Sequence, residues 1–159
     1  MKNVMQKQTL FVLALLGSVN LTALAAAPGQ PLRALYITGG CCHDYDQEKV
    51  IVPGGVKARA SIEWTIVQEG GKGTKRQDIE KSIYQNPDWA KGYDIIVHNE
   101  CFASDVDPAF IDKVLAPHRA GTPAVVIHCM MHTFRDFKQD TFREFLGVTS
   151  THHGKKHPL

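Results

Sequence analysis

Histidine and cysteine residues occur at or just after the C-terminal ends of three apolar segments of this 159-residue chain. They lie in the stretches GGCCHDY at residues 39–45, HNECF at residues 98–102 and HCMMH at residues 128–132. Histidine moves protons near neutral pH, a cysteine thiolate is a nucleophile, and both residue types bind zinc. These stretches therefore point to acid/base, nucleophilic or metal-dependent chemistry.

The pair His43-Asp44 has the composition of a general acid or base with a carboxylate that orients it. Asp44 is equally suited to cap a helix that begins behind it, and both roles stay open. Glu100 is an acid, a base or a hydroxyl acceptor if it faces a cleft, and the partner of a surface cation if it does not. The predicted catalytic residues are His43, Asp44, Glu100 and His128.

Other residues of the same stretches are predicted to bind a substrate. The pair Gly39-Gly40 makes a tight turn, or it lets a ligand approach exposed backbone amides closely. The predicted substrate-binding residues are Gly39, Gly40, Tyr45, Asn99, His132 and Arg135.

A divalent metal such as zinc is a further interpretation of these histidines and of Cys129. Nitrogen and sulfur donors suit zinc, and the predicted ligands are His43, His128, Cys129 and His132. The spacing H-C-x-x-H is not an established zinc motif, so the sequence does not require a cofactor. Cys129 is alternatively a nucleophile at a sharp turn behind a strand, although two methionines stand where such a turn favours small residues.

The elements that must position these side chains follow from the apolar pattern. Apolar runs predict strands over residues 33–38, 62–68, 94–99 and 124–128. Helices are expected over residues 46–60, 78–84, 105–118 and 139–146, with Pro53 interrupting or kinking the first. In the third helix, apolar residues recur on one face, and Asp105 or Asp107 can cap its first turn.

Continuous apolar strands that alternate with helices are typical of a parallel sheet covered on both faces. The predicted fold class is therefore α/β, a three-layer α/β/α flavodoxin-like domain with a mainly parallel sheet. In such sheets, ligands bind beyond the carboxyl ends of the strands. The three reactive stretches then converge at one rim, and this convergence is the strongest functional signal in the sequence.

The N-terminal segment and the charge balance limit the function classes. Residues 1–25 combine Lys2 and Lys7 with an apolar run and small residues, which predicts a signal peptide cleaved before Ala26. Without these two lysines, the 18 basic residues of the chain become 16, against 16 acidic residues. A neutral product argues against binding of nucleic acid or anionic lipid. We expect a single domain over residues 26–159, periplasmic or secreted and outside the membrane, with its oligomeric state open.

Four cysteines in an oxidising compartment make disulfides plausible. A disulfide between Cys101 and Cys41 or Cys42 is one possibility, because the first and third strands should be neighbours, and the pairing stays open. The adjacent residues Cys41 and Cys42 are not expected to pair with each other.

Four strings of the chain, ITGGCCHDYDQEK, ARASIEWTIV, WAKGYDIIVHNECFA and PAVVIHCMMHTFR, resemble the ThuA-like (trehalose utilisation) family from about Leu32 onward. The resemblance implies the flavodoxin-like fold of class I glutamine amidotransferases. His43 and Asp44 match the family's His-Asp motif, and His128 matches its strand-end histidine. Cys129 lacks the flanking glycines of the amidotransferase relatives, so glutaminase chemistry is not carried over. Family members usually continue further, so the ThuA-like domain at 26–159 is expected to lack its C-terminal part.

The resemblance also implies a role in carbohydrate metabolism. The resulting expectation is an exported enzyme of isomerase, lyase or hydrolase type that acts on a sugar or 3-keto-sugar by acid/base chemistry, with or without a metal. The alternative is a non-catalytic carbohydrate-binding or partner module, or an inactive fragment. In the binding module, the rings available for stacking on sugars would be Trp64, Trp89, Tyr45 and Phe102.

Overall fold

The computed structural model describes residues 29–150, 152, 154 and 155 of the chain. The predicted signal peptide, residues 1–25, lies outside the described residues. Within the described part of the chain, no helix combines the length and the apolar character needed to cross a membrane.

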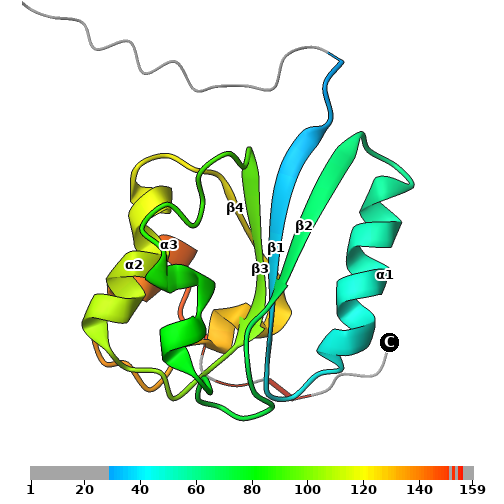
Figure 1. The fold of residues 1–159 in the computed structure, drawn as a ribbon. Coiled ribbons are helices and arrows are strands. Elements are labelled where there is room, and N and C mark those ends of the chain that lie inside the picture. The colour runs from blue at the N-terminus through cyan, green and yellow to red at the C-terminus, as the bar shows by residue number, and fades with distance from the viewer. Residues whose placement is uncertain (1–28, 151, 153, 156–159) are drawn as a thin grey trace, which may run out of the picture.

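One parallel sheet organises the fold (Figure 1). Its strands are β1 (Leu32–Gly40), β2 (Ile62–Gln68), β3 (Ile95–Cys101) and β4 (Ala124–Val126), in the order β2-β1-β3-β4. All three strand pairs are parallel, which confirms the predicted α/β fold with a flavodoxin-like parallel sheet. The strands β1 and β3 lie at the centre, and their apolar runs are buried because both faces are covered.

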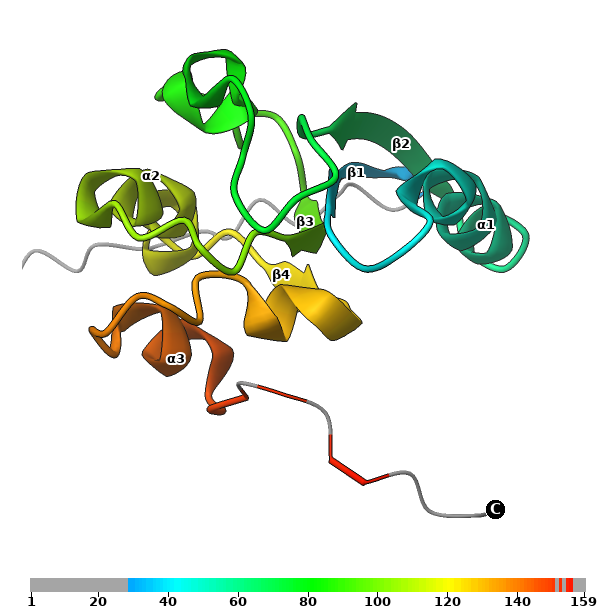
Figure 2. The ribbon, with the colours of Figure 1, turned by 90° about the horizontal axis from the view of Figure 1, so that it is seen from below.

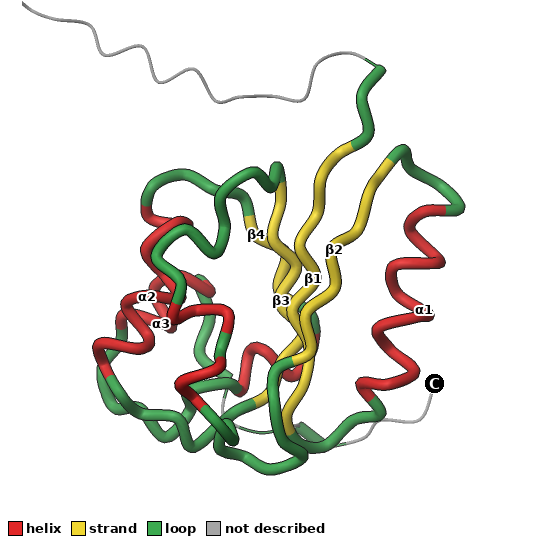
Figure 3. Tube along the Cα trace, in the orientation of Figure 1, coloured by secondary structure: helices red, strands yellow, loops and turns green. Residues whose placement is uncertain are grey.

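Helices form the two outer layers (Figures 1 and 3). Helix α1 (Tyr45–Lys57) covers one face, while α2 (Pro108–Arg119) and α3 (Thr141–Leu146) cover the other. The main hydrophobic core lies between the sheet and α2 and α3, and its largest contributors include Leu35, Ile37, Ile96, Ile111 and Leu115.

Several predicted boundaries shift for local reasons. Helix α1 runs through Pro53 as one element, and α2 begins at Pro108 behind Asp107, whose carboxylate accepts the N–H of Ala109 at 3.0 Å. The helix expected over residues 78–84 is instead two 3-10 turns, η1 (Ile79–Lys81) and η2 (Ile83–Gln85). The last strand ends earlier than predicted, and a third 3-10 helix, η3 (His128–His132), begins where its end was expected.

Candidate functional site

The connection from β1 to α1 lies at the carboxyl edge of the sheet, which Figure 2 views along the strands. Gly39 and Gly40 belong to β1 and not to a loop, and both have positive φ angles, +133° and +103°. A Cβ on Gly40 would overlap the carbonyl oxygen of Cys101 on β3, and a Cβ on Gly39 would approach the Glu69 carbonyl oxygen to 2.5 Å. These glycines therefore allow close contact between backbones.

A pocket of about 740 Å³ opens beside this connection. Its walls come from the end of β1, the first turn of α1, the end of β2 and the loop that follows β2. The lining residues are Gly40, Cys42, His43, Asp44, Tyr45, Asp46, Gln47, Gln68, Gly71 and Lys72. The volume lies within the range usual for small-molecule sites, and the polar side chains suit a polar ligand.

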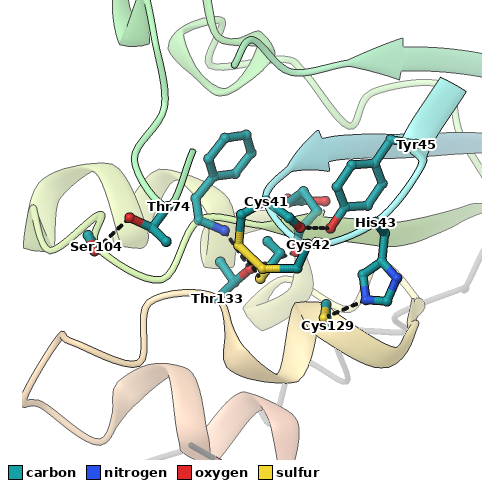
Figure 4. The surroundings of a disulfide bond; sticks show 11 residues. Cys41, Cys42, His43, Tyr45, Thr74, Ser104, Cys129 and Thr133 are labelled. Carbon is teal, nitrogen blue, oxygen red and sulfur yellow. Dashed lines mark hydrogen bonds between the residues drawn. A yellow bond between two sulfur atoms is a disulfide. The ribbon is translucent and has the colours of Figure 1, made fainter. Parts of the chain in front are cut away.

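His43 lies at this pocket with two ordered neighbours. Its Nε2 is 2.9 Å from Sγ of Cys129, and its Nδ1 is 3.6 Å from Oε1 of Glu48 (Figure 4 shows the His43–Cys129 contact). About 29% of the His43 side chain is exposed. The arrangement places a thiol on one ring nitrogen and a carboxylate on the other, as in thiol enzymes that use a histidine base.

The residue that orients His43 is Glu48 and not the predicted Asp44. Asp44 caps α1, because its carboxylate accepts the backbone N–H of Gln47 at 3.1 Å and the side-chain amide of Gln47 at 3.0 Å. The second Glu48 oxygen accepts the Asn99 amide at 2.7 Å, which holds the carboxylate in place. Sequence reasoning missed Glu48, although its position one helical turn beyond the cap was a usable signal.

Cys129 and Cys101 are free, buried thiols. Burial raises the pKa of Cys129. Burial, with a contribution from Cys129, raises the pKa of Cys101 to about 12. The nearby Arg135 opposes both shifts, although it is itself exposed. Both sulfurs are therefore protonated at neutral pH, and neither is a preformed thiolate.

The cysteine pairing differs from the prediction. Cys41 forms a disulfide with its neighbour Cys42 (Figure 4), so the expectation that these two residues would not pair was wrong. Cys101 is a free thiol, so its possible disulfide with Cys41 or Cys42 is not formed. The φ of +84° at Cys42 turns the chain sharply and brings the two adjacent side chains together. The expected nearness of the strands is nevertheless confirmed, because Sγ of Cys101 lies 3.6 Å from Sγ of Cys41.

Among the described residues, two clusters have ligand atoms within 4.8 Å of one another, as a metal ion requires. One comprises His43, His128 and Cys129; the other comprises Cys41, Cys42 and Cys101 and would bind a metal only after reduction of the Cys41–Cys42 disulfide. The first set offers two nitrogens and one sulfur, a donor set that fits zinc with a position left for a further ligand.

His132, the fourth predicted metal ligand, is not part of the first cluster. It is buried at the end of η3, and its Nε2 lies 3.0 Å from the hydroxyl of Ser150. His128 is exposed at the start of η3, with its ring centroid 4.8 Å from that of His43. The 3-10 helix η3 therefore places His128 and Cys129 beside His43, and it places His132 beside Ser150.

Glu100 and Asn99 do not line the pocket. Consecutive residues of a strand point to opposite faces of the sheet. Asn99 faces α1, where it is buried and its amide also donates to the Tyr36 hydroxyl at 2.5 Å. Glu100 faces α2 and is fully buried, so the predicted role at a cleft is wrong, and Asn99 has no exposed amide for a substrate.

Glu100 belongs to a buried charge cluster that sequence reasoning missed. Arg76 lies at its centre, with contacts of 3.0 Å to Glu69, 3.4 Å to Glu100 and 2.8 Å to Asp105. The Tyr84 hydroxyl also donates to Glu100. Burial alone would raise the pKa of Glu100, but its cationic and hydrogen-bonding neighbours outweigh this effect and hold the pKa below the ordinary value. Arg76 comes from a glycine-rich loop and carried no sequence signal.

A histidine pair extends this cluster toward the surface. Nδ1 of His118 is 2.9 Å from the carbonyl of Thr122, and because a carbonyl only accepts, this nitrogen carries the proton. Nε2 of His118 then accepts from Nε2 of His98, 3.0 Å away, and Nδ1 of His98 lies 3.3 Å from Glu100. Burial lowers the pKa of His118 to about 4, in agreement with this neutral tautomer.

Three of the four rings considered for sugar stacking are inside the protein. Tyr45, Trp89 and Phe102 are all less than 6% exposed, so none offers a face to a sugar. Tyr45 instead donates its hydroxyl to the Cys41 carbonyl at 2.9 Å, and burial raises the pKa of that hydroxyl. Trp64 is half-buried on the edge strand β2.

Comparisons with models of protein families, with curated proteins and with solved structures find no match to this chain.

Proposed function

We propose that this chain is an exported enzyme of the ThuA-like type that acts on a sugar or 3-keto-sugar by acid/base chemistry at His43. The observation that carries the proposal is that His43 lines an open polar pocket while the Glu48 carboxylate lies 3.6 Å from its Nδ1. A carboxylate on one ring nitrogen fixes the tautomer and stabilises the imidazolium that forms when the other nitrogen takes a proton.

The reaction that fits this arrangement is removal of a proton from carbon next to a carbonyl. Because Nδ1 of His43 lies 3.6 Å from the Glu48 carboxylate, Nε2 is the atom that we assign to accept the substrate proton. Nε2 now faces the buried Cys129 thiol, so in this proposal the His43 ring turns toward the pocket to bring Nε2 to a substrate carbon. Lys72 and Gln47 line the pocket, and they supply a cation for the enolate oxygen and an amide for substrate hydroxyls.

The cluster of His43, His128 and Cys129 supports a metal-assisted form of the same proposal. A bound zinc ion would supply Lewis-acid polarisation of the substrate carbonyl. Zinc content per chain tests this form on protein purified without a metal-affinity tag. Zinc that is lost in Cys129→Ala and kept in His132→Asn supports it, because His132 lies outside the cluster; equal zinc contents in the two variants contradict it.

Solvent deuterium exchange tests the acid/base proposal directly. We expect keto-sugars incubated with the protein in heavy water to gain deuterium next to the carbonyl, observed by NMR. His43→Asn should abolish the exchange, while the control His152→Asn, which changes an exposed histidine, should keep it. Exchange that survives in His43→Asn would refute the assignment. Sugar binding without exchange would favour the binding module.

A further inference from the structure

The four cysteines of the chain gather at the carboxyl rim, and Figure 4 labels Cys41, Cys42 and Cys129. Cys42 is bonded to Cys41, and Cys41 lies 3.6 Å from the free thiol of Cys101. Cys42 is exposed and lines the pocket, whereas the other three cysteines are buried. A free thiol thus stands beside a disulfide whose far sulfur faces solvent.

We propose that these residues form a thiol–disulfide exchange site in which Cys41 changes its partner between Cys42 and Cys101. Cys101 first loses its proton at alkaline pH, and its sulfur then attacks the Cys41 sulfur and forms the Cys41–Cys101 bond. The Cys41–Cys42 bond breaks, and the Cys42 sulfur leaves with the electron pair. Cys42 takes up a proton equivalent to the one that Cys101 gave up. The disulfide count is unchanged, so no oxidant or reductant is consumed.

The backbone brings the chain segments of Cys41 and Cys101 together. Gly40 is paired with Cys101 across β1 and β3, and the N–H of Cys41 donates to the Cys101 carbonyl at 3.1 Å. The Tyr45 hydroxyl fixes the Cys41 carbonyl from the other side. A Cys41–Cys101 disulfide needs the two sulfurs to approach by roughly 1.5 Å, from 3.6 Å to a bond length of about 2.05 Å, and it needs the Cys101 side chain to rotate into line with the Cys41–Cys42 bond.

The exchange changes the chemistry of the pocket. Before it, the pocket wall carries a disulfide sulfur, which is attacked by thiols. After it, the wall carries the free Cys42 thiol next to His43, which reacts with electrophiles and with small disulfides. The ligand class of the site is therefore low-molecular-weight thiols in one state and small electrophiles or disulfides in the other. This inference does not depend on the proposed sugar chemistry.

Alkylation of the native, unreduced chain tests the exchange. The protein is incubated with iodoacetamide at mildly alkaline pH, quenched in acid, digested with pepsin and analysed by mass spectrometry. We expect label on Cys42 together with a disulfide that joins the separate peptides of Cys41 and Cys101. Label confined to Cys101 or Cys129, with Cys41 still bonded to Cys42, would overturn the proposal, and so would an unlabelled chain that keeps that bond.

Two matched variants identify the attacking sulfur. Cys101→Ala removes the proposed nucleophile, so labelling of Cys42 should be lost. Cys129→Ala removes a buried thiol that takes no part in the bond exchange, so Cys42 should still be labelled. Equal labelling of Cys42 in the wild type and in Cys101→Ala would refute the mechanism. The presence or absence of the cross-linked peptide in the wild type decides the proposal without either variant, even if Cys101→Ala does not fold.

Discussion

Replacement of Arg76 by methionine should unfold the protein or bring it close to unfolding at neutral pH. The Arg76 side chain is 1% exposed, and the three carboxylates that contact it, from Glu69, Glu100 and Asp105, are at most 3% exposed. Methionine fills much of the same space but leaves these carboxylates without their shared cation. The variant therefore tests the charge more than the packing.

The expected loss of unfolding free energy can be worked out from the cost of leaving the buried carboxylates charged without a partner or of protonating them. Breaking a buried ion pair typically costs about 3–5 kcal/mol. A buried glutamate that instead takes up a proton at pH 7, against an ordinary pKa near 4.3, costs about 4 kcal/mol. With one cation serving three carboxylates, we expect a loss of about 4 kcal/mol or more, out of the 5–15 kcal/mol that is usual for a folded domain.

The unfolding free energies of the wild type and of Arg76→Met should change with pH in opposite directions. In the wild type, the lowered pKa of Glu100 contributes stability above its ordinary pKa, and that stability is lost as the pH falls through the lowered value. In Arg76→Met, the carboxylates have raised pKa values, so the variant loses stability as the pH rises. The difference in unfolding free energy between the two proteins should therefore shrink as the pH falls from 7 toward 4.5.

Urea unfolding followed by tryptophan fluorescence measures both effects. Trp89 is a suitable reporter, because it is buried and its ring packs against Tyr84 at 4.9 Å between centroids. The matched control is Arg119→Met, which breaks an exposed pair with Asp112 and should change little. A loss for Arg76→Met at pH 7 no larger than that of the control, or a difference that widens on acidification, would refute the reasoning.

Three further predictions concern the site and the histidine pair. Glu48→Gln should lower the rate of proton exchange on a keto-sugar by about ten- to hundredfold with His43 still present; an unchanged rate and pH profile would remove Glu48 as a positioning residue. Gly40→Ala should destabilise the protein, because its φ is positive and its Cβ would overlap the Cys101 carbonyl, and a thermal unfolding midpoint at or above that of the wild type would contradict this. Because burial lowers the pKa of His118 to about 4, the unfolded chain binds more protons below pH 6.5, so wild-type stability should fall as the pH drops from about 6.5 to 4. His118→Gln should flatten that part of the pH profile of unfolding free energy.

Local patterns along the chain were enough to predict the architecture. Continuous apolar runs such as RALYIT and DIIVHN can be buried on both faces only within a covered sheet, and the segments between them have helical spacing. A parallel sheet then places every strand end at one edge, so the meeting of His43 and Cys129 at that edge could be expected from the sequence alone. These inferences depend on local composition and on the periodicity of apolar residues, and both are properties of short segments of the sequence.

Other features depended on which face and which partner a side chain meets. Asn99 and Glu100 are adjacent in sequence, yet one reaches Glu48 beneath α1 while the other joins Arg76 beneath α2. The sequence does not specify which face of the sheet each of these two side chains will occupy, because a shift of one residue in the strand register would exchange the faces of Asn99 and Glu100.

The sequence by itself determined the order of the elements and the rim where reactive residues collect, since both follow from local burial patterns. Only the tertiary structure decided that Glu48 orients His43, that Asp44 is a cap, and that Cys41 bonds to Cys42 with Cys101 beside it. Those outcomes depend on distances of a few ångströms between residues far apart in the chain, which are set by the packing of strands and helices against one another.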